Sequence, residues 1–164
     1  MNTYEELVGE SRVWVFQAER ELSETEYEAI TGELTQFVDN WISHGSLLKA
    51  TFQLLHNRFI VFMVDEEGDR MCGRATDASV RLIKELEAKY HISMLDRNRM
   101  AFIDNKGEIQ SCKLNELNYL IEEGKVTPQT KVFNNLVQNK NEFEKSWIVP
   151  MAESWQNSYI MQNH

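Results

Sequence analysis

The six consecutive apolar residues 59–64, FIVFMV, constrain the fold more than any other feature of the chain. Side chains alternate between the two faces of a strand, so a strand of this composition must be covered on both faces. Residues Arg12–Gln17, RVWVFQ, have the same doubly apolar character. We therefore predict that these two strands form the central pair of one sheet and run parallel to each other.

Helix and strand patterns surround this pair. Ser23 and Glu26 have the spacing of a capping box, and apolar residues recur every three or four positions from there to Ile42. We expect His44-Gly45 to end that helix. An alternating strand at 48–54, the run 59–64, a helix beginning at Thr76 or Asp77 and a strand at 100–103 follow. The order β-α-β-β-α-β predicts a ferredoxin-like α+β sandwich.

The remaining residues show shorter patterns, which predict a small α/β appendage. We expect a ferredoxin-like domain at 1–104 and the appendage, packed on it, at 105–164. Two helices can cover only one face of the sheet. The other apolar face is expected to be covered by the appendage, by a second subunit in a homodimer, or by both.

The charge balance argues against several kinds of partner. The chain has 26 acidic and 17 basic residues and a formal net charge of −9, which repels nucleic acid and anionic lipid. Its longest apolar run is far shorter than the ~20 residues that cross a bilayer. Two cysteines, Cys72 and Cys112, favour a reducing compartment. We expect a cytoplasmic protein that binds no nucleic acid and does not insert into membranes.

Residues 65–77 match part of the sequence pattern of a nucleotide-binding site. Asp65-Glu66 follow an apolar strand like the acids of an ATPase, and Gly68 and Gly73 have the spacing of a phosphate loop. Such a loop needs Lys and then Ser or Thr to hold phosphate and Mg²⁺, but Arg74-Ala75 occupy those positions. ATP hydrolysis is therefore disfavoured.

Other chemistry in this loop stays open. Cys72 lies between Arg70 and Arg74 just before the N-terminus of the predicted helix, a setting that lowers the pKa of a thiol. The histidines at 44, 56, 91 and 164 have no metal-ligand spacing, so we expect no metal and no cofactor. If the loop binds a small anion, the candidate ligand-binding residues are His44, Arg58, Asp65, Glu66, Arg74 and Asp77.

Several blocks of sequence, in order, resemble a family of small Bacteroidetes proteins whose members are often labelled ABC transporter ATPase. The blocks are RVWVFQA (12–18), Trp41 with His44-Gly45, NRFI (57–60) with Asp65-Glu66, VFNNLV (132–137), and WIVP (147–150) with ESW (153–155). The resemblance covers nearly the whole chain and implies a source lineage and a compartment rather than a mechanism. The family tends to have Gly-Cys-Ser-Ile-Asp where this chain has GRATD (73–77), so a shared thiol mechanism does not carry over.

Residues 102–155 resemble the GYF-type adaptor module. The blocks are LNEL (114–117), GKVTPQTKV (124–132) and WIVP (147–150), whereas the module's usual Gly-Pro is replaced by Ser111-Cys112-Lys113. The resemblance implies an adaptor-like fold for the appendage. Candidate protein-binding residues there are Asn134, Asn135, Trp147 and Trp155.

Two classes of function follow. The first is a non-enzymatic protein-binding or assembly module, because the sequence shows no convergent set of catalytic groups. The second is a binder of small anions, or an enzyme, that uses the 65–77 loop. A concave pocket joining His44, Arg58, Asp65 and Arg74 would favour the second class, and a flat apolar surface would favour the first.

Overall fold

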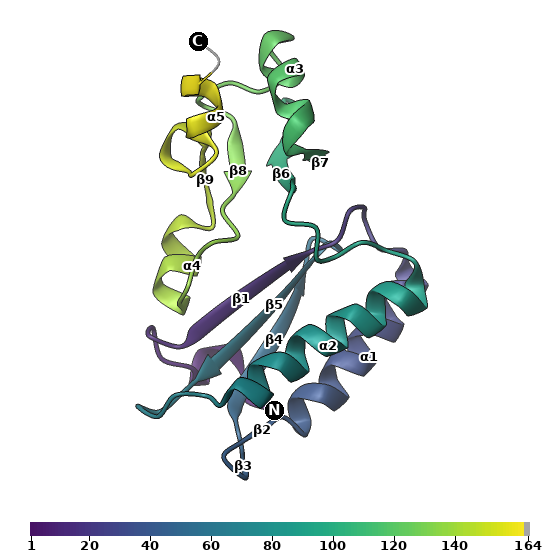
Figure 1. Ribbon diagram of the computed structural model, residues 1–164, viewed down its shortest axis with the longest axis vertical. Helices are drawn as coiled ribbons and strands as arrows, with labels where there is room; N and C mark the ends of the chain where they lie inside the picture. Colours follow the sequence, from purple (N-terminus) through teal and green to yellow (C-terminus); the bar gives the residue numbers. More distant parts are fainter. Residues whose placement is uncertain (163–164) are drawn as a thin grey trace. The chain divides into compact units, whose positions relative to one another are not determined.

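The computed structural model (Figure 1) describes residues 1–162 and divides into two compact units. The first unit contains Met1–Leu95 and Leu136–Phe143; the second contains Asp96–Asn135 and the residues from Glu144 onward. Both combine helices with antiparallel sheets, so the α+β class is confirmed. The boundary falls after Leu95, earlier than the expected boundary at 104.

The sheet of the first unit has the order β1-β5-β4, with β1 at Arg12–Gln17, β4 at Lys49–Leu55 and β5 at Phe59–Asp65. The predicted parallel pairing of β1 and β5 is wrong, because Arg12 lies opposite Val64 and Gln17 opposite Phe59. A tight turn makes β4 and β5 antiparallel, and helix α1 (Glu24–Asp39) returns the chain so that β1 and β4 point the same way. A strand between them is therefore antiparallel to both, and β1 lies at an edge rather than in the centre.

The expected fourth strand, β6 (Arg99–Ile103), does not join this sheet. It pairs with β7 (Ile109–Lys113) and β8 (Lys131–Phe133), and β9 (Ile148–Pro150) completes the second sheet in the order β7-β6-β8-β9. The turn after β6 explains this choice, because Asp104 Oδ1 accepts the backbone N–H groups of Lys106 and Glu108 and fixes a local hairpin. The ferredoxin-like order is thus not completed within one sheet.

The segment Leu136–Phe143 meets the outer edge of β1 instead. Val13 donates its backbone N–H to the carbonyl of Gln138 at 3.0 Å, and Arg12 forms an isolated bridge with Asn139. Nearby, the buried Lys140 ammonium donates to the carbonyls of Tyr4 and Leu7, each at 2.8 Å, and lies over the Tyr4 ring. One side chain therefore ties this segment to the N-terminal residues.

Two helices lie side by side on one face of the first sheet (Figure 1): α1 and α2 (Gly73–Tyr90). Ile30 and Leu34 of α1 and Ile83 and Leu86 of α2 are fully buried in one cluster with Phe62. Each such side chain contributes about 1.5–3 kcal/mol by leaving water. This packing holds both helices against the sheet.

The opposite face of β5 is also covered. Phe59, Val61 and Met63 are fully buried in the single chain, so their burial calls for no second subunit. The remaining elements are short: η1 (Tyr4–Glu6), β2 (Ile42–Ser43), β3 (Ser46–Leu47), η2 (Leu114–Glu116), α3 (Leu117–Glu122), α4 (Lys140–Ser146), η3 (Met151–Glu153) and α5 (Asn157–Gln162). Within residues 1–162, every helix is too short or too polar to cross a membrane.

Candidate binding surface

A small hairpin follows α1 where the sequence predicted more helix. The helix ends at Asp39, and β2 and β3 then pair Ile42 with Leu47 and Ser43 with Ser46. The turn residues His44 and Gly45 both have positive φ, 52° and 79°, as the tightest hairpin turns require. Ile42 was expected on the buried stripe of the helix, but its side chain is 54% exposed.

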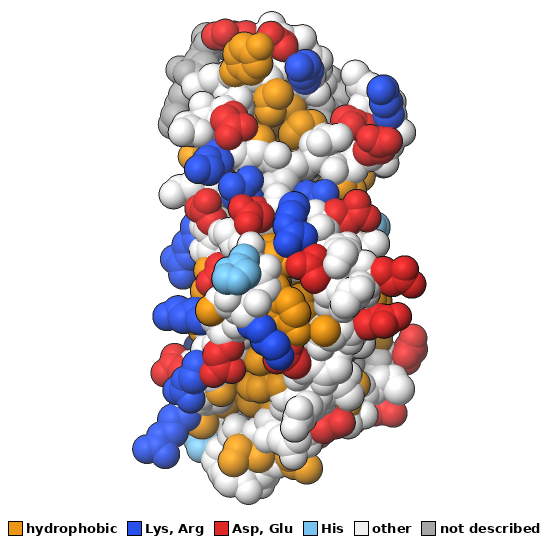
Figure 2. Space-filling model, turned by 90° about the vertical axis from the view of Figure 1, so that its right-hand side faces the viewer, with side chains coloured by type: hydrophobic (Ala, Val, Ile, Leu, Met, Phe, Trp, Pro, Cys, Tyr) orange, Lys and Arg blue, Asp and Glu red, His pale blue; other side chains and the backbone are white. Residues whose placement is uncertain are grey.

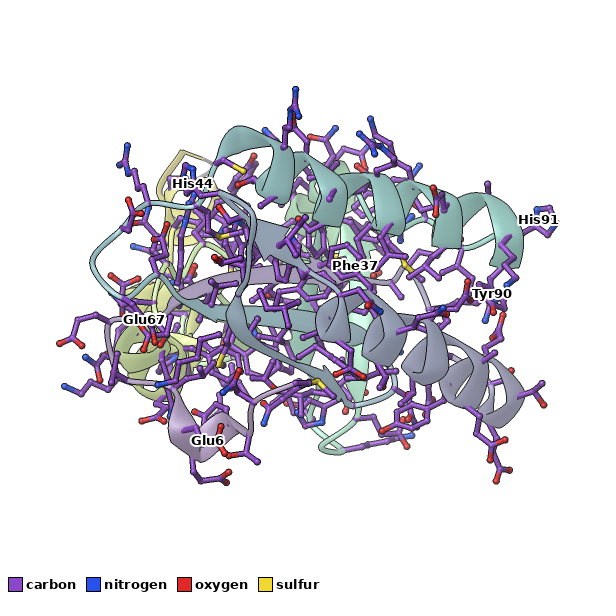
Figure 3. All side chains as sticks on the ribbon, turned by 90° about the horizontal axis from the view of Figure 1, so that it is seen from below. Glu6, Phe37, His44, Glu67, Tyr90 and His91 are labelled. Carbon is purple, nitrogen blue, oxygen red and sulfur yellow. The ribbon has the colours of Figure 1, made fainter. Side chains whose placement is uncertain are left out.

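Three hydrogen bonds fasten this hairpin region to the start of α2. Trp41 donates its indole N–H to the carbonyl of Ala75 at 2.8 Å, and Ser43 Oγ accepts the backbone N–H of Cys72 at 2.8 Å. The ring Nε2 of His44 lies 2.9 Å from the carbonyl of Arg70, a spacing for an N–H donated by the ring. Figure 3 shows His44 beside the beginning of α2. The hairpin is therefore held in one position rather than free to move.

The hairpin presents two large apolar side chains to solvent. Ile42 is 54% exposed and Leu47 is 67% exposed. They lie directly opposite each other on neighbouring strands, so both project from the same face of the hairpin. We call Ile42, Leu47 and the start of α2 from Cys72 to Arg74 the hairpin surface.

Cys72 lies within this surface as a half-buried free thiol. The Ser43 hydroxyl, followed by the backbone N–H groups of Ala75 and His44, favours the thiolate and lowers the pKa of Cys72 to about 7. Ser43 Oγ accepts the Cys72 N–H, which leaves its own hydrogen to donate to sulfur. Burial raises the pKa of the second thiol, Cys112, to about 11. Of these two thiols, Cys72 is the one suited to nucleophilic chemistry near neutral pH.

Two of the predicted ligand-binding residues, Asp65 and Glu66, form their contacts with residues of the sheet and of the loop that leads into α2. Asp65 pairs with Lys49 and accepts the backbone N–H of Glu67. Glu66 accepts the backbone N–H of Met71 at 2.7 Å and lies 3.8 Å from the Arg12 guanidinium. These contacts of the carboxylates close the turn that leads into α2.

The other candidate ligand-binding residues do not converge. Arg74 and Asp77 are exposed on the first turns of α2, at the same end of β5 as His44. Arg58 precedes β5, so the seven strand residues, each rising ~3.3 Å, separate it from Asp65. Partial burial lowers the pKa of its guanidinium. The anion pocket that would join Arg58 to His44, Asp65 and Arg74 is not formed.

The candidates in the second unit have mainly structural contacts. Trp147 is only 5% exposed, donates its indole N–H to Asn135 Oδ1 at 3.0 Å and packs edge-on against Phe133. Asn134 donates its backbone N–H to the Trp147 carbonyl. Trp155 is half-buried and packs against Tyr159. Trp147 therefore belongs to the core rather than to a contact surface.

The second unit also has an open depression of about 270 Å³, lined by residues that include Asp104, Thr127, Thr130 and Lys131. The Asp104 carboxylate already accepts hydrogen bonds from the backbone N–H groups of Lys106 and Glu108 and from the side-chain amide of Gln110. Within the described part of the chain, no group of His, Cys, Asp and Glu side chains could hold a metal ion. The hairpin surface remains the best-defined candidate.

The hairpin was missed because its sequence signal has two interpretations. His44-Gly45 fits a helix C-cap and also a two-residue hairpin turn, and the alternation of only two residues on each side is too short to decide between them. No protein-family model, curated protein or solved structure matches this chain. The resemblances drawn from sequence blocks therefore stay predictions.

Proposed function

We propose that this protein is a non-enzymatic protein-binding module whose contact site is the hairpin surface. The observation that carries the proposal is the exposed Ile42–Leu47 pair on a hairpin that is bonded to α2. Covering such side chains with a partner yields up to about 1.5–3 kcal/mol each. Because the hairpin is already fixed, little conformational entropy is lost on binding.

A matched pair of substitutions tests this proposal. Leu47→Asp places a charge on the hairpin surface, whereas Val8→Asp places the same charge on another exposed aliphatic residue, which is 48% exposed. Each protein is immobilised and exposed to an extract of the source organism, and retained proteins are quantified by mass spectrometry. We expect a protein retained by the wild type and by Val8→Asp to be lost from Leu47→Asp. Equal retention by both variants would refute the proposal.

A second candidate function is thiol chemistry at Cys72, in keeping with a reaction that uses the 65–77 loop. The specific observation is the half-buried thiol beside the Ser43 hydroxyl at the start of α2. A thiolate there can attack a disulfide, which forms a mixed disulfide with Cys72 and releases the other sulfur as a thiolate. We also propose a cytoplasmic location, because both cysteines are free.

A further inference from the structure

Helix α2 carries a row of cations on its outer side. Arg74, Arg81 and Lys84 are exposed and lie seven and three residues apart, a spacing that places them on one face of a helix. Arg70 precedes the helix and is also exposed. Figure 3 shows nitrogen-tipped side chains pointing outward from α2. Figure 2 shows Lys and Arg side chains, with Asp and Glu side chains among them, along the lower left side of the picture. We call Arg74, Arg81 and Lys84 the basic face of α2.

These cations are unpaired in a protein of net charge −9. Among residues 1–162, the side chains of Arg74, Arg81 and Lys84 form neither an ion pair nor a hydrogen bond. By contrast, Lys89 on the last turn of the same helix pairs with Glu33 at 3.2 Å. The exposed acids Asp77 and Glu85 lie on the same side of α2. The surface therefore has mixed charge with an excess of free cations.

We infer that the basic face of α2 binds an acidic segment of the partner protein, best an acidic helix. This inference rests on the proposed function and names the chemistry of its partner. Seven helical residues span about 10.5 Å, so carboxylates one heptad apart on a partner helix match Arg74 and Arg81. Opposite charges arranged in this way speed association and select the partner.

The chain favours an acidic protein over nucleic acid. A phosphate backbone places charge continuously along the surface, where it would meet the exposed carboxylates of Asp77 and Glu85. Carboxylates on a folded partner can instead lie opposite the cations alone. The hydrogen bonds from Trp41 to Ala75 and from Cys72 to Ser43 join this face to the exposed apolar pair. An apolar contact with a charged margin is the usual composition of a protein interface.

A charge-reversal experiment with a matched control tests the inference. The triple variant Arg74→Glu, Arg81→Glu, Lys84→Glu is compared with Lys106→Glu, Lys113→Glu, Lys131→Glu, which reverses three exposed lysines of the second unit. Each variant changes the net charge by −6, from −9 to −15. The probe is a fluorescent helix-forming peptide with glutamates at heptad spacing, and binding to the full chain is followed by anisotropy at two salt concentrations.

We expect the wild type and the lysine control to bind the peptide, and the α2 variant to bind at least roughly tenfold more weakly. Equal weakening in both variants, or no binding by the wild type, would overturn the inference. So would a DNA oligonucleotide that displaces the peptide more effectively than unlabelled peptide does, because phosphate would then be the preferred ligand. A partner lost from Leu47→Asp but retained by the α2 variant would leave the proposed function standing and remove this inference.

Discussion

Ser43 Oγ accepts the backbone N–H of Cys72 at 2.8 Å, although the two residues lie 29 positions apart in the chain. Ser43 is buried on the hairpin, and Cys72 is the residue before the first turn of α2. The bond therefore positions the hairpin and also places a hydroxyl beside the thiol. The apolar surface and the reactive group depend on the same contact.

Replacing Ser43 with Ala should both destabilise the fold and weaken the thiolate. The Cys72 N–H would lose its acceptor, at a cost of about 1–3 kcal/mol in the free energy of unfolding. The pKa of Cys72 should rise, because the hydroxyl is the first of the groups that lower it. Urea denaturation and the pH dependence of alkylation measure the two effects. Ser46→Ala, at the exposed opposite position of the hairpin, should change neither.

The two cysteines should differ sharply in reactivity. Iodoacetamide should modify Cys72 in the folded protein with a rate that rises through pH 7, whereas Cys112, whose pKa is raised to about 11 by burial, should react only after unfolding. Peptide mass spectrometry of the wild type, Cys72→Ser and Cys112→Ser assigns the modified site. Similar rates for the two thiols would show that the environment described for Cys72 is wrong.

The same pKa also predicts the sign of a stability effect. A thiol with a folded pKa near 7 and an ordinary unfolded pKa near 9 stabilises the fold fully above pH 9. This contribution is lost as the pH falls through 7. As the pH rises from 6 to 9, the wild type should therefore gain free energy of unfolding relative to Cys72→Ser. Urea denaturation of both proteins at each pH measures this difference. A constant difference over this range would contradict the lowered pKa.

The Lys140 side chain should be essential for the attachment of the 136–143 segment. Lys140→Met keeps the length of the side chain but leaves the carbonyls of Tyr4 and Leu7 without their donor. We expect the free energy of unfolding to fall by about 1–3 kcal/mol for each carbonyl that stays buried without a hydrogen-bond donor. Amide hydrogen exchange should increase at Val13, whose N–H bonds to Gln138. The exposed Lys145→Met, on the same helix, is the control and should be close to neutral.

The capping box of α1 gives a further pH-dependent prediction. Arg20 and the backbone N–H of Ser23 lower the pKa of Glu26 to about 2. A carboxylate with a depressed pKa stabilises the fold above its unfolded value near 4.5, and this contribution is lost as the pH falls towards 2. Glu26→Gln should therefore be less stable than wild type at pH 7, with a difference that narrows below pH 4. Thermal denaturation across this range would detect it.

Local features could be predicted from the sequence, whereas long-range ones could not. The Ser23–Glu26 capping box depends on residues three apart, and the burial of residues 59–64 depends only on their composition. Strand direction depends on which strand lies between which others, so apolar patterning did not determine that β5 is antiparallel to β1. Likewise, the sheet that β6 joins is determined by the turn at Asp104 and by pairing with β8. The apolar pattern of residues within β6 does not reveal either contact.

The candidate site shows the same division. The sequence predicts Cys72 near the start of a helix capped by Thr76 or Asp77, whereas Cys72 itself precedes the first residue of α2. Ser43 approaches the thiol only through the fold. The predicted pocket of His44, Arg58, Asp65 and Arg74 rests on residue type alone, and β5 separates Arg58 from the other three residues. The sequence places Ile42 on a helix because the turn after it has two interpretations, whereas the side chain lies exposed on the hairpin.

Site-specific photocrosslinking tests the central claim, that the Ile42–Leu47 pair contacts a protein partner, most directly. A photoreactive benzoylphenylalanine is placed at Leu47, or at Val8 as the control, and the full chain is irradiated in cells of the source organism. We predict a discrete covalent adduct of higher mass from position 47, absent from position 8 and reduced by Ile42→Asp. Adducts of equal yield from both positions, or none from position 47, would contradict the account.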